Sequence, residues 1–187
     1  MLTGIGRGPT SSIERDIAAL KATFFQPNDQ DIRALAARLG ELALARRVML
    51  ATAESCTGGL VAGAITDIAG SSGWFERGFV TYSNRAKIEQ LGIDPGIIAR
   101  HGAVSEETAL AMAQGARSAS GAQWTVAVTG IAGPAGGSPA KPVGTVWFAW
   151  AGPGGVEALH RHLDGDRAAI RAASVAIALQ GLVDRLD

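Results

Sequence analysis

A single cysteine, Cys56, is present in the 187-residue sequence. One thiol excludes an internal disulfide and a zinc site built from cysteines, and it fits a reducing compartment, so we expect a cytoplasmic protein. The sequence has no run of 18 apolar residues, the length that a membrane-spanning helix needs. Residues 1–9 contain one arginine and no apolar core of the kind found in signal peptides. The sequence therefore predicts neither export nor a membrane span.

An excess of charge of one sign is also lacking, because 17 Lys and Arg side chains balance 17 Asp and Glu side chains. Without a broad positive field we expect no binding to nucleic acid or to an anionic membrane, and any anion site must be local. The composition, with 47% hydrophobic and 18% charged residues, is that of a globular domain. The 25 glycines lie above the usual share of about 7% and predict tight turns or ligand-binding loops.

The chain divides into an expected N-terminal arm, residues 1–28, and one domain, residues 29–187. The arm mixes Gly, Ser, Thr and Pro with one short periodic patch, Ile13, Ile17 and Leu20, which favours a brief amphipathic helix. We find no linker or internal repeat within residues 29–187. A chain of this length can bury roughly two-thirds of the surface that its unfolded form exposes.

Apolar periodicity in the domain predicts helices that alternate with strands. Helices are expected over residues 29–47, 60–68, 85–91, 106–118 and from 167 onward, with Asp29 and Ser105 as caps. Strands are expected over residues 48–53, 78–83, 124–129, 143–151 and 156–163, the second of them buried and the last two joined as a hairpin. Residues 94–96 read as a turn. The pattern indicates an α/β fold: a layered α/β/α arrangement with a mixed, mostly parallel sheet and a C-terminal hairpin plus helix.

Two loops follow expected strands and combine hydroxyl side chains with glycine: residues 54–59 and residues 129–137. Ligands of such folds bind at the carboxyl ends of the strands, so these loops are the expected site. Ser55 lies where a strand turns into a helix, and the amides of Thr57, Gly58 and Gly59 are expected to point forward with the positive end of the helix dipole. That geometry stabilises an oxyanion or binds a phosphate, although a serine at this position can also be a simple helix cap.

Cys56 is a rival nucleophile, although a lone cysteine after a strand is commonly a small buried hydrophobe. A serine nucleophile needs a base, and the three histidines, His101, His160 and His162, do not form an evident Ser-His-Asp arrangement. Lys87 is the other option, with Tyr82 near enough in sequence to orient it. A desolvated lysine loses proton affinity and can act as a base near neutral pH, whereas a solvated helix-surface lysine cannot.

The second loop has a Gly-x-x-Gly-Pro pattern, Gly130 to Pro134, whose bare backbone can approach a ligand, while Thr129 presents a hydroxyl at the strand end. Neither loop has the spacing of a P-loop or of a dinucleotide fingerprint. His160 and His162 share one face of a strand but have no evident third ligand, so we expect no metal and no cofactor. Arg167 and Arg171 are placed to clamp a phosphate, or else form a solvated basic face.

Taken together, these segments resemble the CinA C-terminal family, whose stand-alone members include bacterial nicotinamide mononucleotide deamidases. The resemblance rests on an ordered series of blocks: residues 53–60 (AESCTGGL), 65–72 (ITDIAGSS), 75–84 (FERGFVTYSN), 101–105 (HGAVS), 130–134 (GIAGP), 141–147 (KPVGTVW) and 165–167 (GDR). It covers about residues 30–185. Larger CinA proteins carry an additional N-terminal domain, for which this chain is too short, and residues 1–28 depart from the stand-alone pattern.

The resemblance implies a metal-free amidohydrolase that converts nicotinamide mononucleotide to nicotinate mononucleotide and ammonia. By this likeness Ser55 is the nucleophile, Lys87 its proton acceptor and Tyr82 a supporting group. The expected substrate contacts are Thr57, Gly58, Gly59, Thr129, Gly130, Ala132 and, for the phosphate, Arg167. A nucleotide-binding regulatory module without catalysis, and a hydrolase of another small amide, remain open. Trp74, Phe75, Trp147 and Trp150 are expected in the core or at subunit contacts, and we expect a homo-oligomer.

Overall fold

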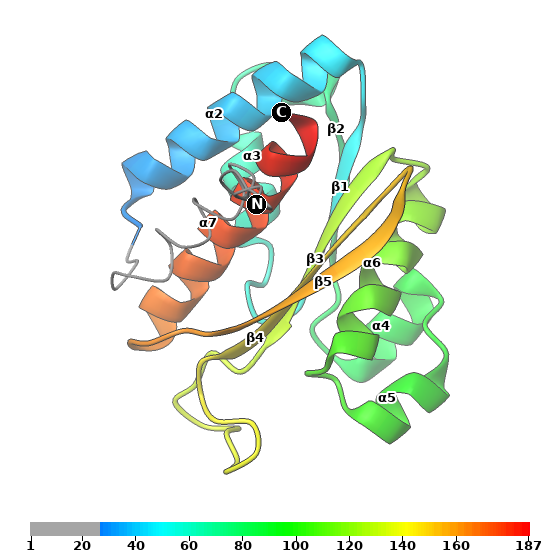
Figure 1. Cartoon of the computed structure of the whole chain (residues 1–187), viewed down its shortest axis with the longest axis vertical. Helices are drawn as coiled ribbons and strands as arrows, with labels where there is room; N and C mark the ends of the chain where they lie inside the picture. Colours follow the sequence, from blue (N-terminus) through cyan, green and yellow to red (C-terminus); the bar gives the residue numbers. More distant parts are fainter. Residues whose placement is uncertain (1–26) are drawn as a thin grey trace, which may run out of the picture.

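A five-stranded sheet lies between two layers of helices in the computed structural model, which describes residues 27–187 (Figure 1). The expected helix around residues 13–20 lies outside the described residues. The strands are β1 (Leu50–Glu54), β2 (Phe75–Val80), β3 (Trp124–Gly130), β4 (Thr145–Gly152) and β5 (Gly155–His162). The helices of this part of the chain are α2 (Asp29–Arg46), α3 (Leu60–Thr66), α4 (Asn84–Leu91), α5 (Pro95–His101), α6 (Glu106–Ser120) and α7 (Arg167–Leu186), with a 3-10 turn at Ser71–Gly73.

The strand order is β2-β1-β3-β4-β5. β1 pairs in parallel with both β2 and β3, whereas β4 runs antiparallel to both β3 and β5. β5 therefore points in the same direction as the first three strands. The predicted α/β fold with a mixed, mostly parallel sheet and a C-terminal hairpin is confirmed. The carboxyl ends of β1, β2 and β3 lie at the same end of the sheet, and the candidate site lies at this end.

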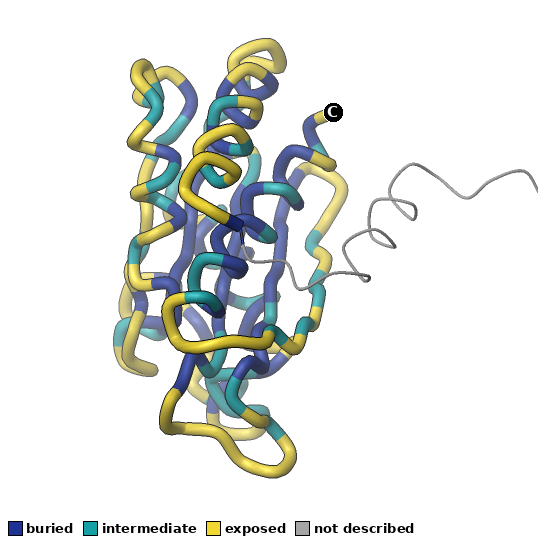
Figure 2. Tube along the Cα trace, turned by 90° about the vertical axis from the view of Figure 1, so that its left-hand side faces the viewer, coloured by how far each residue is buried: buried dark blue, intermediate teal, exposed yellow. Residues whose placement is uncertain are grey.

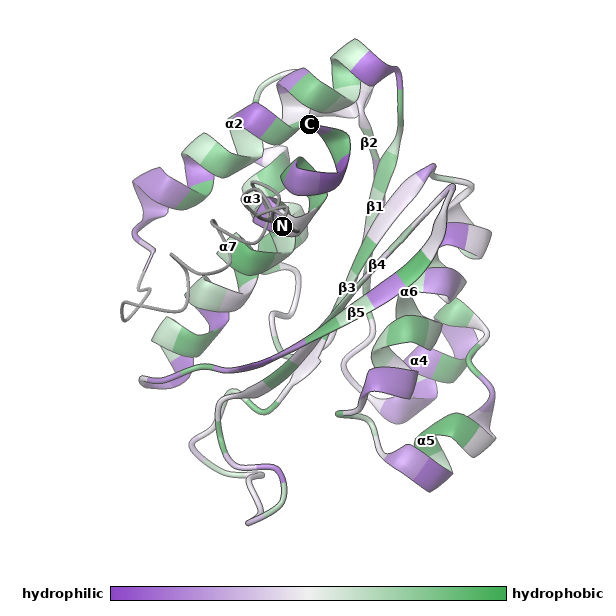
Figure 3. Cartoon of the chain, viewed as in Figure 1, coloured by the Kyte–Doolittle hydropathy of each residue, from purple (hydrophilic) through white to green (hydrophobic). Residues whose placement is uncertain are grey.

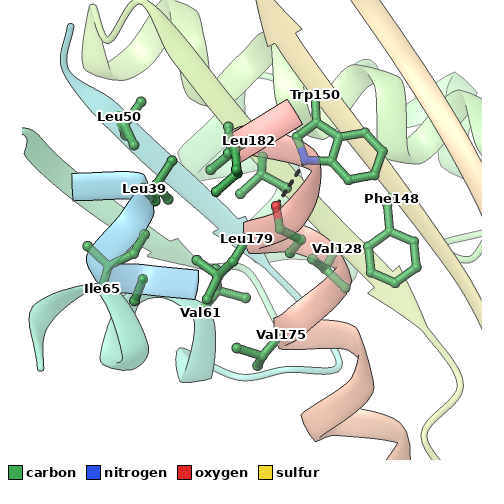
Figure 4. Packing of buried hydrophobic residues seen from close by; sticks show 14 of the residues in the cluster. Leu39, Leu50, Val61, Ile65, Val128, Phe148, Trp150, Val175, Leu179 and Leu182 are labelled. Carbon is green, nitrogen blue, oxygen red and sulfur yellow. Dashed lines mark hydrogen bonds between the residues drawn. The ribbon is translucent and has the colours of Figure 1, made fainter. Parts of the chain in front are cut away.

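Each face of the sheet is covered by three helices, α2, α3 and α7 on one side and α4, α5 and α6 on the other (Figure 1). The larger core packs Leu39, Ile65 and Leu179 from the first helix layer onto Val128 and Phe148 of the sheet (Figure 4). Burial concentrates on the sheet and the inward helix faces, and hydrophilic and hydrophobic residues alternate along the helices accordingly (Figures 2 and 3). Within residues 27–187, no helix is both long and apolar enough to cross a membrane.

The tryptophans confirm part of the expected core. Trp74 and Trp150 are buried, whereas Phe75 and Trp147 are only partly covered. Trp150 also fixes α7, because its indole N–H donates to the Ala178 carbonyl at 3.1 Å (Figure 4). A Cβ on Gly181 would lie 2.3 Å from the same indole, so glycine at this position lets the last helix approach the sheet closely.

Three local predictions were wrong. The second strand covers Phe75–Val80, not 78–83, and it contains no buried residue, because it is an edge strand that pairs only with β1. Residues 94–96 open helix α5: the Asp94 carboxylate accepts the Gly96 N–H and Pro95 occupies the first turn, where a missing N–H costs nothing. The cap of α2 is Asn28 in a reciprocal capping box with Asp31, and Asp29 is already helical.

Candidate active site

Ser55, Lys87 and the end of β3 meet at the carboxyl edge of the three parallel strands. Ser55 follows β1, and its N–H donates to the Val128 carbonyl of β3 at 2.9 Å. Lys87 lies in the first turn of α4, which directly follows β2 and is capped by the Ser83 hydroxyl. Both side chains line a hollow of about 250 Å³ that also contains Thr129 and Gly130. The sequence-based location of the site is therefore consistent with the geometry.

The amine of Lys87 is buried against the hydroxyl of Ser55. Lys87 is only 1% exposed, and its Nζ is 3.0 Å from Ser55 Oγ. The Nζ also donates to the Thr81 carbonyl at 2.8 Å and to the Tyr82 carbonyl at 3.4 Å. The alternative of a solvated surface lysine is therefore wrong.

Burial lowers the pKa of Lys87 to about 8, because the ammonium form is poorly solvated there. The amine's hydrogen-bond partners among the described residues are a hydroxyl and two carbonyls, none of which carries a formal negative charge to hold the proton. A substantial fraction of the amine is thus neutral in mildly alkaline solution. In the neutral form two N–H groups can serve the two carbonyls, which leaves the nitrogen lone pair for the Ser55 proton.

Cys56 directly follows Ser55 but has the wrong chemistry for a nucleophile. The residue is 6% exposed, and burial raises the pKa of its thiol to about 11. The thiolate is the reactive form, and a buried thiol of this kind is inert. The structure argues for Ser55 over Cys56.

The turn between β1 and α3 is organised by the carboxylate of Glu54, a residue that the sequence analysis did not single out. Its oxygens accept the N–H groups of Gly59, Val61 and Ala62 at 2.9, 3.0 and 2.8 Å. The Gly58 N–H donates to the Ser55 carbonyl at 3.1 Å. The amides of Gly58 and Gly59 therefore do not point toward a ligand, and that expectation was wrong.

The two glycines of this turn are needed for their backbone conformation. Gly58 and Gly59 have φ values of 61° and 97°, a backbone conformation that residues with a Cβ rarely adopt. This conformation returns the chain so that α3 begins over the Glu54 carboxylate. The amides of Cys56 and Thr57 donate to no oxygen within residues 27–187, although both face the Cys56 sulfur. Cys56 lines the hollow, whereas Thr57 is fully buried.

The opposite wall of the hollow is held by Thr129 and Lys141. The Thr129 hydroxyl donates to the Ala103 carbonyl at 2.7 Å, so it fixes the wall instead of projecting freely. Lys141, which belongs to one of the blocks that carry the family resemblance and had no expected role, donates from Nζ to the carbonyls of His101 and Val104 at 3.0 and 2.7 Å. Gly130 has no room for a side chain, because a Cβ would lie 2.8 Å from the Thr145 carbonyl oxygen.

Tyr82 and Arg167 border the hollow on the solvent side. The Tyr82 residue is 63% exposed, and its hydroxyl accepts a long hydrogen bond of 3.5 Å from Arg167 Nη2. The prediction that the Tyr82 side chain orients Lys87 is therefore wrong. Only the main-chain carbonyl of Tyr82 contacts the amine. Arg167 also donates from Nη1 to the Gly133 carbonyl at 2.8 Å.

A second, larger hollow of about 650 Å³ adjoins the first, and Ala132 and Arg167 line both. Arg171 and the start of α7 line the larger one, and Arg171 donates from Nη2 to the Thr57 carbonyl at 2.9 Å. Arg167 and Arg171 thus border a hollow that shares Ala132 and Arg167 with the Ser55 hollow and that Asp166 also lines. This arrangement offers a place for an anionic group at a distance from the reactive hydroxyl.

The histidines lie elsewhere and none of them lines the Ser55 hollow. His101 contacts Glu107 at 3.0 Å, and the His160 ring lies 5.0 Å from that of Trp147. Within residues 27–187 there is no group of three His, Cys, Asp or Glu side chains arranged to hold a metal ion.

Comparisons with known proteins agree with the resemblance read from the sequence. The model of the CinA C-terminal domain matches residues 32–186. The nicotinamide-nucleotide amidohydrolase PncC of Pseudomonas putida is 54% identical over 152 residues, which are 81% of this chain and 95% of that protein. The protein of the same name from Escherichia coli K12 is 52% identical over 155 residues, 82% of this chain and 94% of that one.

A solved structure gives the same result for the fold. The competence/damage inducible protein CihA from Agrobacterium tumefaciens superposes with a TM-score of 0.81 at 48% identity, covering 87% of this chain and 98% of that chain. The region matched by the family model contains all the site residues described above. The sequence blocks and the three-dimensional arrangement thus point to the same set of relatives.

Proposed function

The chain belongs to the CinA C-terminal domain family, and from this premise we propose that it hydrolyses the carboxamide of a nicotinamide nucleotide, with Ser55 as nucleophile and Lys87 as base. The relatives named as nicotinamide-nucleotide amidohydrolases support the substrate class. The observation that carries the mechanism is the buried contact of 3.0 Å between Lys87 Nζ and Ser55 Oγ.

The proposed reaction begins with the neutral amine of Lys87. The Ser55 oxygen attacks the carboxamide carbon while its proton moves to Lys87 Nζ, and the carbonyl oxygen becomes an oxyanion. The amides of Cys56 and Thr57, which donate to no oxygen within residues 27–187, stabilise this charge, and Cys56 directly follows the nucleophile. When the C–N bond breaks, Lys87 returns its proton to the leaving nitrogen, and ammonia departs. Water then cleaves the acyl ester by the same steps, which yields the carboxylate.

The two hollows suit the two ends of a mononucleotide. The smaller one, lined by Ser55 and Thr129, takes the carboxamide end, and the larger one, lined by Arg167 and Arg171, takes the phosphate. Ala132 lines both hollows and Gly130 lines the smaller one, and both are small residues that leave room for the substrate. Thr57, Gly58 and Gly59 shape the turn beneath the reacting carbon, and Tyr82 closes the outer side.

The test is ammonia release from nicotinamide mononucleotide by the wild type and by Ser55→Ala. We expect the substitution to lower the rate by at least about 10³-fold while the protein stays folded, because the covalent step is lost. The control is Ser120→Ala. The Ser120 hydroxyl donates to the Ala116 carbonyl at the far end of α6, away from the site, so this variant should retain wild-type turnover. Near-normal turnover by Ser55→Ala would remove the serine from this role. Nucleotide binding by the wild type without any product would indicate a binding module instead.

We further propose that the protein acts in the cytoplasm as a homo-oligomer. A lone, unpaired Cys56 suits a reducing compartment. Leu44, Leu60, Val80 and Tyr82 are large hydrophobic side chains that stay exposed, and Val80 belongs to the edge strand β2. Light scattering after gel filtration measures the mass of the assembly, and a monomer at micromolar concentration would contradict the proposal.

A further inference from the structure

Glu54 is a buried acid directly before the proposed nucleophile, and its side chain does not line the Ser55 hollow. The residue is 1% exposed. A carboxylate buried in this way is costly unless hydrogen bonds replace its hydration. Four donors do so here: the amides of Gly59, Val61 and Ala62, and the Thr52 hydroxyl at 3.2 Å. A set of four donors on one buried side chain calls for a role beyond filling space.

We propose that Glu54 is a positioning residue for the Ser55 reaction, an inference that rests on the function proposed above. By accepting the N–H groups of the cap residue Gly59 and of Val61 in the first turn of α3, its carboxylate fixes where the Ser55–Gly59 turn ends. The turn contains the nucleophile and the amides of Cys56 and Thr57, so fixing its far end sets the distance between the nucleophile and the oxyanion donors. The carboxylate touches neither the substrate nor the reacting atoms.

The same residue also connects the turn to the base. The Glu54 carbonyl accepts the Thr81 N–H at 2.8 Å, and the Thr81 carbonyl in turn accepts the Lys87 ammonium at 2.8 Å. The main chain of residue 54 thus aligns the base with the strand, and its side chain aligns the oxyanion donors. Nucleophile, base and anion donors are held in register by one strand end.

Withdrawing the α3 amides has a further effect on where an oxyanion can bind. Because Glu54 occupies the N–H groups of Gly59, Val61 and Ala62, these amides cannot draw the substrate oxygen toward the helix. The anion binds instead at the amides of Cys56 and Thr57, of which Cys56 lines the hollow together with Lys87. Loss of the carboxylate would free the three helix amides and offer the substrate an unproductive second position.

The experiment compares Glu54→Gln and Thr52→Val with the wild type, using nicotinamide mononucleotide as substrate. A side-chain amide in place of the carboxylate turns an N–H₂ group toward the backbone N–H donors, so the turn must shift. We expect kcat to fall about 10- to 100-fold with KM within about threefold, since a displacement of about 1 Å can cost roughly 10²-fold in rate. Thr52→Val removes one donor of the four and should lower kcat by a few fold, again without raising KM.

Thr125→Val is the matched control, because Thr125 is also a buried strand threonine whose hydroxyl binds a carbonyl, that of Ala113 at 2.8 Å. It lies near the start of β3, away from the site, and should lose thermal stability but keep kcat. Equal kcat losses in Thr125→Val and Glu54→Gln at equal stability would overturn the proposal. So would wild-type kcat in Glu54→Gln.

Labelling of Ser55 by an alkyl fluorophosphonate, followed by mass spectrometry, separates this inference from the proposed function. Slow labelling of Glu54→Gln beside fast labelling of the wild type supports the positioning role, whatever the natural substrate. Equal labelling rates in the two proteins overturn the positioning role but leave the Ser55–Lys87 pair intact. Absence of labelling in the wild type contradicts the proposed function, and with it the inference.

Discussion

The reactivity assigned to Ser55 depends on how the surrounding protein treats one amine. Lys87 would be protonated and useless as a base if it reached water, where a lysine has a pKa near 10.4. Its burial beside two carbonyls and a hydroxyl removes solvation without supplying a countercharge. Cys56, one residue away from the nucleophile, shows the opposite result of the same environment, since burial keeps its thiol protonated, with a pKa of about 11. The same burial thus favours the neutral amine of Lys87 and the protonated thiol of Cys56.

Turnover should depend on pH through the protonation of Lys87. Because burial lowers the pKa of Lys87 to about 8, kcat/KM should rise with pH and level off above a midpoint near that value. The direction follows from the need for a neutral amine, which dominates only above the pKa. Steady-state ammonia release measured at several pH values gives the profile.

Variants of α4 provide the control for this profile. Lys87→Met should lose at least about 10³-fold in rate at every pH, because among residues 27–187 only the Lys87 amine is hydrogen-bonded to the Ser55 hydroxyl. Arg85→Met removes an exposed cation on the same helix, paired with Glu89 at 2.7 Å, and should keep the wild-type midpoint. A profile that is flat between about pH 6 and 10 in the wild type would show that Lys87 is not the titrating base.

Among the elements, the connection between α5 and α6 depends on side chains from distant parts of the chain. Lys141 ties the His101 and Val104 carbonyls to the segment of residues 131–144, and Thr129 ties the Ala103 carbonyl to β3. Lys141 and Thr129 therefore anchor the wall opposite Ser55 from distant parts of the chain, while the Ser105 and Thr108 hydroxyls donate to the Gly102 carbonyl from nearby. The position of the wall determines how tightly the substrate is bound.

We predict that Lys141→Met raises KM about three- to tenfold and lowers kcat less. The substitution keeps the length of the side chain but leaves two carbonyls without a charged donor, a loss of about 1.5 to 3 kcal/mol for a hydrogen bond of this kind. A looser wall weakens ground-state binding, whereas Ser55 and Lys87 stay in place. Steady-state kinetics with nicotinamide mononucleotide measure the split. A fall in kcat at unchanged KM would instead place Lys141 in the chemical step.

Most elements of the fold could be predicted because their signals are local. Ser105 caps α6 and its helical spacing is regular, while the Gly-Pro-Gly-Gly turn of residues 152–155 marks the hairpin. β2 was misplaced because the prediction assumed a buried, apolar strand. This edge strand instead carries polar and charged residues such as Arg77. Helix α5 was missed because Asp94 and Pro95 can begin either a turn or a helix, and the difference depends on Ile98 packing into the core.

At the site, sequence patterns identified the loops but not the direction of each group. Ser55 and Lys87 are 32 positions apart, and only the pairing of β1 with β2 brings them together. Glu54 was read as the first residue of the loop 54–59, without a role of its own. The available signal was an acid that ends an apolar strand just before a helix start, which indicates a carboxylate bound to helix amides. That side chain, and not the reactive centre, receives the α3 amides.

For the whole molecule, the site lies at the end of the sheet where the two helix layers diverge. α4 and the α5–α6 connection contribute the proposed base and the wall from one face, while the turn before α3 and the start of α7 contribute the proposed nucleophile and the arginines from the other. Both cores must therefore be intact for the site to form (Figure 1). Because Lys87 is buried within this assembly, its protonation is linked to the stability of the whole fold.

Burial of Lys87 makes the free energy of unfolding rise with pH. Burial lowers the pKa of Lys87 from 10.5 to about 8, so the unfolded chain binds more protons than the folded one between these values. The cost of burying the ammonium is fully present below pH 8 and is relieved as the pH rises toward 10.5. Cys56 acts in the opposite direction, because burial raises its pKa from 9.0 to about 11 and its contribution is lost as the pH rises through that window.

We therefore predict that, in a Cys56→Ala background, the free energy of unfolding with Lys87 present rises relative to that of Lys87→Met between pH of about 7 and 10. Each pKa unit corresponds to about 1.4 kcal/mol, which sets the expected gain at about 1 to 3 kcal/mol. Urea denaturation at a series of pH values measures the two curves, and all other titrating groups cancel in their difference. Parallel curves would mean that the folded protein does not lower the pKa of Lys87, and the base proposed for Ser55 would have to be sought elsewhere.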